Sequence, residues 1–519
     1  MTTDTARVPA KTWVAIVAAT IGAFMAVLNI QIVNAALADI QGAIGASVDD
    51  GGWISTSYLV AEIVVIPVTA WLARVFSFRR YLIANAALFL FFSCACAFAR
   101  DIEQMIVLRA LQGFTGGVLI PMAFTLIMTL LPKSRQPTGL AIFAVAASFA
   151  PAIGPAVGGY LAGTWGWQAI FYVNLVPGSV MLVLLFLSLE RQLMQLGLLR
   201  QGDWAGIATM ALGLGALQVV LEEGNKEDWF DSPFIVRLAL VAVISLGLFV
   251  WIELRSPQPL LNLRLLARRN FGTGVFAMFL LGAAIYGSVF ILPAYLARIQ
   301  GYNAEQIGMV LAWTGLPQIL LIPLVPALMR KVDARWLVVV GISLFALSNF
   351  LNVGLTADVA ADQLMLPNIV RAIGQALVLT PLTALAIAGI DTEDAGSASA
   401  LLNVMRNQGG AVAIALLQTI LATREQFHAS VLGESLTLFD EATRARLDQL
   451  ARYFLEQGVT DAATAGRNAV IAIVDQVHRQ AYTMAIGDVF FLLGAVLVAA
   501  LGAALFLGRP AARSAGTEP

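Results

Sequence analysis

Residues 108–117 read LRALQGFTGG and lie within an apolar run of roughly 105–131. Helical spacing of i, i+3, i+4 and i+7 puts four of them on one helix face: Arg109, Gln112, Gly113 and Gly116. An arginine in the middle of a membrane helix is costly in lipid, so it must face a bundle interior or a wet cavity and have a partner. The glycines on the same face allow a second backbone to approach. This stretch therefore predicts a bundle of membrane helices with a polar interior.

The composition agrees with an integral membrane protein. Of 519 residues, 59% are hydrophobic and 12% are charged, whereas soluble domains contain about 25% charged residues. A helix needs about 20 apolar residues to cross a bilayer. Fourteen such runs are present, at roughly 12–34, 52–73, 80–99, 105–131, 137–161, 168–189, 204–222, 234–253, 271–296, 305–329, 335–356, 363–389, 396–424 and 481–507. We therefore expect an all-α membrane fold, and the absence of strand periodicity argues against an outer-membrane barrel.

The basic residues predict the orientation of the chain, although its net charge is only −1. With the N-terminus inside, the inside segments hold eighteen lysines and arginines. The short outside loops hold three: Arg100, Lys226 and Arg298. Cytoplasmic loops carry the excess of basic residues. Both termini are therefore expected in the cytoplasm, in a multi-pass protein of the inner (plasma) membrane.

The spans divide into two blocks of six with a pair between them. We expect an N-terminal six-helix half over 1–190, inserted helices 7 and 8 over 191–265, and a C-terminal six-helix half over 266–519. The last part contains a long outside segment at about 425–480 with amphipathic helix periodicity. It is either a helical hairpin that caps the protein's own outer face or a docking surface for a periplasmic partner.

The predicted fifth span contains APAIGPAVGGYLAG, residues 150–163. Gly154, Pro155, Gly158 and Gly159 combine small residues with a helix-bending proline. A bent and closely packed helix suits a rocking interface between two repeats, although a purely structural packing helix could look similar.

These motifs resemble a known family. RALQG followed by GPxxGG resembles two motifs of the major facilitator superfamily, the second of which is associated with its antiporters. Further segments resemble the 14-helix drug:proton antiporter branch of EmrB-type exporters: WGWQAIFYVNLVPG (165–178), LQVVLEEGNKEDWF (217–230), LPAYLARIQGYNAEQIG (292–308), VDAR (332–335) and LLNVMRNQGGAVAIA (401–415).

The resemblance implies a major facilitator fold and a function. It implies proton-driven efflux of small hydrophobic or amphiphilic compounds by alternating access. A periplasmic adaptor and an outer-membrane channel would be partners in a tripartite pump. The chain has no G-x-x-x-x-G-K-S/T sequence, so direct use of ATP is not expected. No cofactor, metal or nucleic-acid partner is expected.

One feature of that branch is missing from the first span. Members of the branch carry L-D-x-T-I-V-N-x-A-L-P there, whereas this chain has LNIQIVNAALA over residues 28–38. Asn29 takes the place of the acid and Gln31 that of the threonine, while Asn34 is retained. Asparagine cannot take up or release a proton. The family's membrane acid is therefore absent at this position.

Glu62, near the middle of the second span, is a candidate replacement. We expect it to carry the proton, with Arg109 as its electrostatic partner and Tyr58 on the same helix face. Two alternatives remain open. Glu62 could be structural, hydrogen-bonded to Asn29 or Gln31, or transport could be uncoupled from protons.

The loop after the second span also departs from the family pattern. AWLARVFSFRR, residues 70–80, lacks both glycines and the acid of the superfamily's motif and keeps a basic cluster of Arg74, Arg79 and Arg80. The cluster is either a weakened cytoplasmic gating loop or simple positive-inside anchoring.

The remaining polar and aromatic residues of the spans are candidates for a substrate cavity. Aromatic faces suit hydrophobic or cationic ligands. The predicted cavity set is Asn29, Gln31, Asn34, Tyr58, Gln112, Tyr286, Phe290, Trp313, Gln318, Asn403 and Arg406.

Other classes of protein fit the sequence less well. An enzyme would need a catalytic set, and the spans contain no histidine and no metal-ligand cluster. A channel is disfavoured because no filter-like repeat is present. Drugs, fatty acids, siderophores and aromatic metabolites all fit as substrates.

Overall fold

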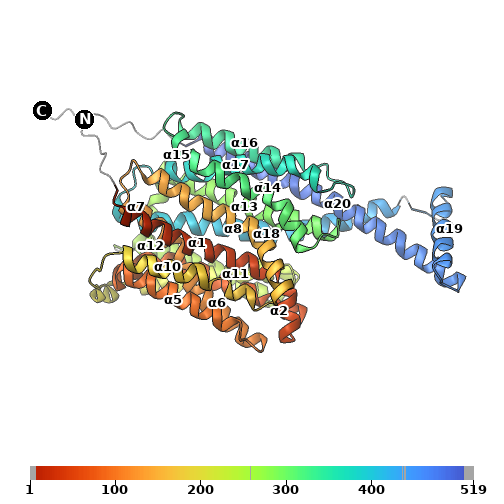
Figure 1. Ribbon diagram of the computed structural model, residues 1–519, viewed down its shortest axis with the longest axis horizontal. Helices are drawn as coiled ribbons and strands as arrows, with labels where there is room; N and C mark the ends of the chain where they lie inside the picture. Colours follow the sequence, from red (N-terminus) through yellow and green to blue (C-terminus); the bar gives the residue numbers. More distant parts are fainter. Residues whose placement is uncertain (1–7, 258, 435, 438–439, 508–519) are drawn as a thin grey trace.

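The computed structural model describes residues 8–257, 259–434, 436–437 and 440–507, which form helices joined by turns (Figure 1). The α-helices are α1 (Ala10–Ala35), α2 (Leu37–Ile44), α3 (Val48–Gly51), α4 (Trp53–Phe76), α5 (Phe78–Cys96), α6 (Ile102–Gly117), α7 (Leu119–Leu130), α8 (Gln136–Trp165), α9 (Ala169–Tyr172), α10 (Leu175–Ser188), α11 (Trp204–Glu223), α12 (Pro233–Arg255), α13 (Arg269–Arg298), α14 (Ala304–Leu321), α15 (Val325–Leu328), α16 (Ala334–Leu351), α17 (Ala361–Ala386), α18 (Ala395–Glu434), α19 (Glu441–Glu456) and α20 (Ala462–Leu505). Short 3₁₀ turns are η1 (Leu196–Gln201), η2 (Trp229–Asp231), η3 (Leu263–Ala267), η4 (Ile322–Leu324) and η5 (Thr392–Asp394).

The predicted spans correspond to helices of this bundle. Within the described part of the chain, twelve helices are long and apolar enough to cross a membrane, and α8 is a thirteenth if its two bent halves count as one span. The predicted span at 396–424 is the first part of α18, which is less apolar than the other spans because it carries Asn403, Arg406 and Asn407. α18 nevertheless packs inside the bundle, against α13, α20 and α4.

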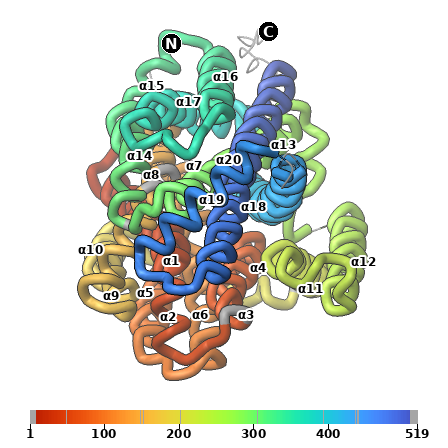
Figure 2. Tube along the Cα trace, turned by 90° about the vertical axis from the view of Figure 1, so that its right-hand side faces the viewer, coloured from red at the N-terminus to blue at the C-terminus, as the bar shows by residue number. Residues whose placement is uncertain are grey.

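The bundle consists of two similar halves and an added pair of helices. In the N-terminal half, α1 packs on α8 and α4 packs on α6. In the C-terminal half, α13 packs on α18 and α14 on α17, so the first helix again meets the fifth and the second meets the fourth. The added pair, α11 and α12, lies beside the bundle, where α11 contacts α4 and α18 (Figure 2).

A proline-rich helix lies between the halves. α8 packs on α1 of its own half and on α14 of the other half. It bends by 48° between Pro151 and Ile153. Pro151 and Pro155 both lie inside the helix and each removes a backbone donor, which accounts for the bend.

The segment after residue 425 projects from one end of the bundle. α18 and α20 continue beyond the other helices, and α19 lies at their far end, where it packs on α20 (Figure 1). The amphipathic helix was therefore predicted correctly, but the interpretation as a hairpin capping the outer face is wrong. Asp440 caps α19 by accepting hydrogen bonds from the backbone and hydroxyl of Thr443, which lower the pKa of its carboxyl group.

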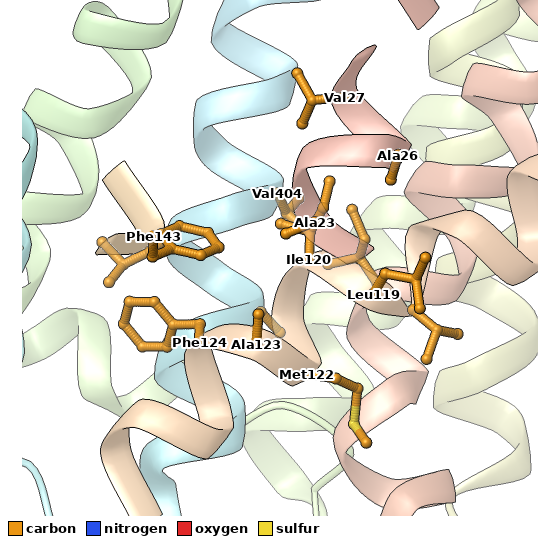
Figure 3. Packing of buried hydrophobic residues seen from close by; sticks show 14 of the residues in the cluster. Ala23, Ala26, Val27, Leu119, Ile120, Met122, Ala123, Phe124, Phe143 and Val404 are labelled. Carbon is orange, nitrogen blue, oxygen red and sulfur yellow. The ribbon is translucent and has the colours of Figure 1, made fainter. Parts of the chain in front are cut away.

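The apolar core joins the two halves. The largest cluster of buried apolar side chains includes Ala23 of α1, Ile120 of α7 and Val404 of α18 (Figure 3). The two halves are also in close contact where α4 ends and α18 begins. A Cβ atom on Gly396 of α18 would lie 2.6 Å from the Cβ of Ala70 of α4, so these two helices meet with almost no side chain between them.

Candidate functional site

A cavity of about 740 Å³ lies between the two halves, lined by residues of α1, α4, α11, α13 and α18. Its wall includes Asn34 and Ser55, where α1 ends and α4 begins, at the end of the bundle opposite the chain termini. Ile120 of the apolar core also lines it. The close contact of Gly396 with Ala70 closes the bundle on the other side. The cavity is therefore accessible from the end at which α19 projects.

Five of the residues predicted for function line this cavity together with Pro155 of the antiporter motif: Gln31, Asn34, Glu62, Tyr286 and Phe290. Two apolar helices, α1 and α13, contribute four of these residues. Asn34 accepts a hydrogen bond of 2.6 Å from Ser55, which ties α1 to α4 at the cavity mouth. The aromatic rings of Tyr286 and Phe290 are one helical turn apart on α13 and face the same space.

Glu62 is the buried acid of this cavity. Its side chain is 2% exposed, yet no hydrogen bond or ion pair within the described residues joins its carboxylate to the protein. Within the part of the chain that the structure describes, no hydrogen bond joins Glu62 to Asn29 or Gln31. Buried polar groups normally have partners, so an unpaired carboxylate in a cavity wall is available to a proton or a ligand.

Arg109 is buried beside the cavity and donates hydrogen bonds to three oxygens. Its Nη1 donates to Asn29 Oδ1 and to Gln112 Oε1, both at 2.6 Å. Its Nε donates to the carbonyl of Ile54 at 3.1 Å, and its guanidinium lies 4.3 Å from the centre of the Tyr58 ring. Asn29, Tyr58 and Gln112 therefore surround Arg109 and do not line the cavity as predicted, because the buried cation requires these oxygens and this ring.

The structure also changes the expected pairing of Glu62. Arg109 forms no ion pair with Glu62, and its hydrogen bonds go to neutral groups. Glu62 has two arginines as electrostatic neighbours, Arg109 of its own half and Arg406 of α18. Arg406 also interacts with Tyr286. Arg406 thus lies close to the cavity without lining it, and it brings the C-terminal half into the environment of Glu62.

Three further residues predicted for the cavity do not line it in this structure. Trp313 of α14 is 44% exposed elsewhere. Gln318 is buried but donates to Gln375 of α17 at 2.7 Å, because α14 turns this face toward α17. Asn403 donates to the carbonyl of Ser399 at 2.9 Å within α18. Together with Arg406 it borders a separate void of about 20 Å³.

The small residues of the antiporter motif hold α8 against α1. A Cβ atom on Gly158 would lie 2.7 Å from the carbonyl oxygen of Ile32, and one on Gly154 would overlap the side chain of Gln31. Pro155, between them, lines the cavity. Gly159 follows Gly158 in the same helix. The motif therefore places the backbone of α8 beside the residue positions of α1 that form the cavity wall.

The basic cluster after α4 does not bridge the halves. Arg79 donates to the carbonyl of Phe186 at 2.8 Å and stacks on its ring, which ties α5 to α10 inside the N-terminal half. Arg74 and Arg80 are exposed. Ser77 takes the place of one family glycine with φ 73°, a conformation that normally requires glycine.

Sequence reasoning missed the contribution of the inserted helix α11. Gln218, Glu222, Glu223 and Lys226 all line the cavity. The hydroxyl of Thr56 donates to Glu223 at 2.7 Å, so α11 is joined to α4 at the wall. Two adjacent carboxylates at the end of an apolar helix were a usable signal, but the sequence does not show which helices the inserted pair contacts.

The fold and the site define a membrane transporter with a central cavity between two similar halves. The model of the Major Facilitator Superfamily matches residues 19–414, and the chain belongs to this superfamily. The colistin resistance protein EmrB of Acinetobacter baumannii is 32% identical over 97% of this chain and 98% of its own length. The fatty acid resistance protein FarB of Neisseria gonorrhoeae is 30% identical over 95% of each chain. The multidrug export protein EmrB of Escherichia coli is 29% identical over 95% of each chain.

Solved structures show the same fold. The proton:xylose symporter XylE has a TM-score of 0.59 at 13% identity, with 95% of each chain covered. The human organic anion transporter MFSD10 has a TM-score of 0.54 at 13% identity, covering 94% of this chain and 100% of the transporter. The chain is thus a multi-pass efflux transporter of this superfamily and not an enzyme.

Proposed function

We propose that this protein exports small hydrophobic or amphiphilic compounds across the inner membrane in exchange for protons, with Glu62 as the proton carrier. The observation that carries the proposal is the position of Glu62, a 2% exposed carboxylate without a hydrogen-bond partner in the described wall of the cavity. Intramembrane acids facing a cavity typically mark proton or substrate pathways.

The surroundings of Glu62 support a reversible proton site. Burial favours a neutral acid, whereas nearby cations favour the carboxylate. Arg406 and Arg109, one from each half, act on Glu62. A rocking movement of the halves would change the distance from Arg406 to Glu62 more than that from Arg109, because Arg109 is fixed to Asn29 within the same half. Proton affinity would then depend on the conformational state.

The open end of the cavity faces outward under this proposal. The excess of basic residues in the segments at the other end favours cytoplasmic termini. The structure then corresponds to an outward-facing state, closed on the cytoplasmic side by α4 and α18. α8, in contact with α1 and α14, is the natural surface along which the halves rock.

The projecting segment suggests a periplasmic partner. α19 and the extensions of α18 and α20 stand clear of the bundle on the side of the open cavity (Figure 1). We infer that they contact a membrane-anchored adaptor, which would connect the cavity to an outer-membrane channel. The names of the relatives, a multidrug export protein, a colistin resistance protein and a fatty acid resistance protein, agree with export of hydrophobic or amphiphilic compounds.

One observation favours an alternative. Asn29 holds Arg109 at the position where the related branch has an acid, so the site lacks that branch's usual proton carrier. A facilitator, or an exporter that is not coupled to protons, would need no other acid in place of the one that is absent at position 29.

Everted vesicles distinguish the two functions. Addition of lipophilic compounds should dissipate a preformed pH gradient in vesicles with the wild-type protein, as read by dequenching of a pH-sensitive dye. Glu62→Gln should abolish this response at equal expression, whereas Glu305→Gln, an exposed acid in the first turn of α14, should leave it unchanged. A full response from Glu62→Gln would reject Glu62 as the carrier.

A further inference from the structure

The mouth of the cavity carries charged residues that proton coupling through Glu62 does not use. Glu222 and Glu223 end α11, and Lys226 follows in the turn to α12. Gln218 donates to Glu222 at 2.9 Å, and Thr56 donates to Glu223 at 2.7 Å. Both side chains are therefore oriented by hydrogen bonds from neutral donors at the cavity mouth.

Lys226 is the cation of this group, and its ammonium occupies a position in the cavity wall that the cationic group of a ligand could occupy. Its Nζ is 2.9 Å from Glu223 Oε2, with 42% of the Lys226 side chain exposed and 5% of the Glu223 side chain exposed. The ammonium group lies over Gly52, at the start of α4, where a Cβ atom would overlap it. Lys226 is the exposed partner of this ion pair, whereas the Glu223 carboxylate is buried and needs a cation beside it. Another cation could therefore take the place of Lys226.

The charges of the cavity are unevenly distributed. Three carboxylates and one ammonium line it: Glu62, Glu222, Glu223 and Lys226. The two buried arginines act at the Glu62 end and do not line the cavity. At the mouth, two carboxylates face one lysine. Glu62, unpaired and 2% exposed, adds a further acid deeper in the same space. The lining thus favours a positively charged guest.

We propose that Glu222 and Glu223 bind the cationic group of amphiphilic substrates, and that Lys226 is a tethered counter-ion which the substrate displaces. The proposal rests on the export function proposed above and names its substrate class. The apolar body of such a compound would lie along the aromatic rings of Tyr286 and Phe290, which line the same cavity. Aromatic rings also attract cations, so the path from the mouth to the centre suits this class.

The site is fixed to both halves of the transporter. Thr56 joins Glu223 to α4, and Trp229, in the turn after α11, donates from Nε1 to Thr419 of α18 at 2.8 Å. Asp228 and Trp229 have φ of 52° and 54°, so this turn holds an unfavourable backbone conformation while Trp229 reaches α18. The inserted pair therefore positions the two carboxylates relative to both halves, which gives it a role in substrate recognition.

Equilibrium binding to the full-length protein in lipid nanodiscs tests the proposal. The ligands are tetraphenylphosphonium, a permanent lipophilic cation, and N-phenyl-1-naphthylamine, a neutral lipophile. The double variant Glu222→Gln with Glu223→Gln should bind the cation about tenfold more weakly and the neutral compound unchanged, since only charge is removed. Lys226→Gln should bind the cation about threefold more tightly, because the competing ammonium is gone. Glu227→Gln, an acid that accepts from Ser232 and does not line the cavity, is the matched control.

Each result has a distinct meaning. Unchanged cation binding in the double variant, or weaker cation binding in Lys226→Gln, would overturn the cation site. The export function would still stand in that case if the wild-type protein binds the neutral compound. Failure of the wild type to bind either compound would overturn both proposals. If the double variant loses both ligands, the single Gln variants decide: weaker cation binding with neutral binding retained supports the site, and equal loss of both ligands rejects it.

Discussion

Arg109 of α6 donates to Asn29 of α1 over 2.6 Å, so a buried cation is paired with an amide and not with an acid. Arg109 donates to three oxygens and lies on one aromatic ring, and no carboxylate among the described residues forms an ion pair with it. Glu62, the buried acid of the cavity wall, has Arg109 and Arg406 as electrostatic neighbours. This separation of the arginine from the acid is the basis of the proposed proton site.

Replacing Arg109 should destabilise the N-terminal half. Arg109→Met would leave the oxygens of Asn29, Gln112 and Ile54 without a donor in a buried environment. We expect the free energy of unfolding in detergent to fall by about 3 kcal/mol. Arg100→Met, at an exposed arginine, should change it by less than about 0.5 kcal/mol. Equal stability of Arg109→Met and the wild type would show that the buried network contributes nothing to folding.

Close packing of α8 on α1 should be necessary for transport. Gly158→Ala would place a Cβ atom 2.7 Å from the carbonyl oxygen of Ile32, which forces the two helices apart. We expect the export rate in proteoliposomes to fall about tenfold, as for a change of about 1.4 kcal/mol in the barrier. Gly163→Ala, in the same helix with nothing within 4 Å of its added Cβ, is the control. Equal rates in the two variants would remove α8 from the rocking interface.

The loop after α4 should be stabilised by restoring a glycine. Ser77 has φ 73°, and its buried hydroxyl has no partner among the described residues. Ser77→Gly relieves the backbone and removes the unpaired hydroxyl, so the free energy of unfolding should rise by about 1 kcal/mol. Ser77→Ala removes only the hydroxyl and should give the smaller gain. A decrease for Ser77→Gly would contradict the assigned strain.

The projecting helix should be dispensable for folding but required in the cell. α19 packs on α20 beyond the bundle. Replacing Glu441–Glu456 with a glycine-serine linker of equal length should therefore leave export in proteoliposomes within about twofold of the wild type, because the cavity is untouched. Resistance of whole cells to a substrate should be lost if this segment docks the adaptor. Full resistance in cells would reject the docking role.

Much of this architecture follows from the sequence because membrane helices are determined by composition and length. The spans, and the need of Arg109 for polar partners, could be predicted from the high cost of placing polar groups in lipid. The close packing at Gly158 followed from small residues at helical spacing. The amphipathic pattern of α19 was equally local.

The remaining features depend on contacts between distant segments. Periodicity gives the face of a helix but not the neighbour that it meets, so Trp313 was assigned to the cavity although it does not line it. Asn29 and Gln112 lie in the polar interior, but their side-chain oxygens accept hydrogen bonds from Arg109 and do not line the cavity. The acids of α11 could be placed only when α11 was seen to pack on α4.

Transport in proteoliposomes with a defined substrate tests the central claim most directly, because it separates substrate translocation from proton coupling. Substrate exchange without a pH gradient and uphill transport with a gradient are compared for wild type and Glu62→Gln. We predict that Glu62→Gln retains exchange and loses uphill transport, since the substrate still crosses but no proton is carried. Uphill transport by Glu62→Gln at the wild-type rate would show that the proton follows another route and that Glu62 is not the carrier.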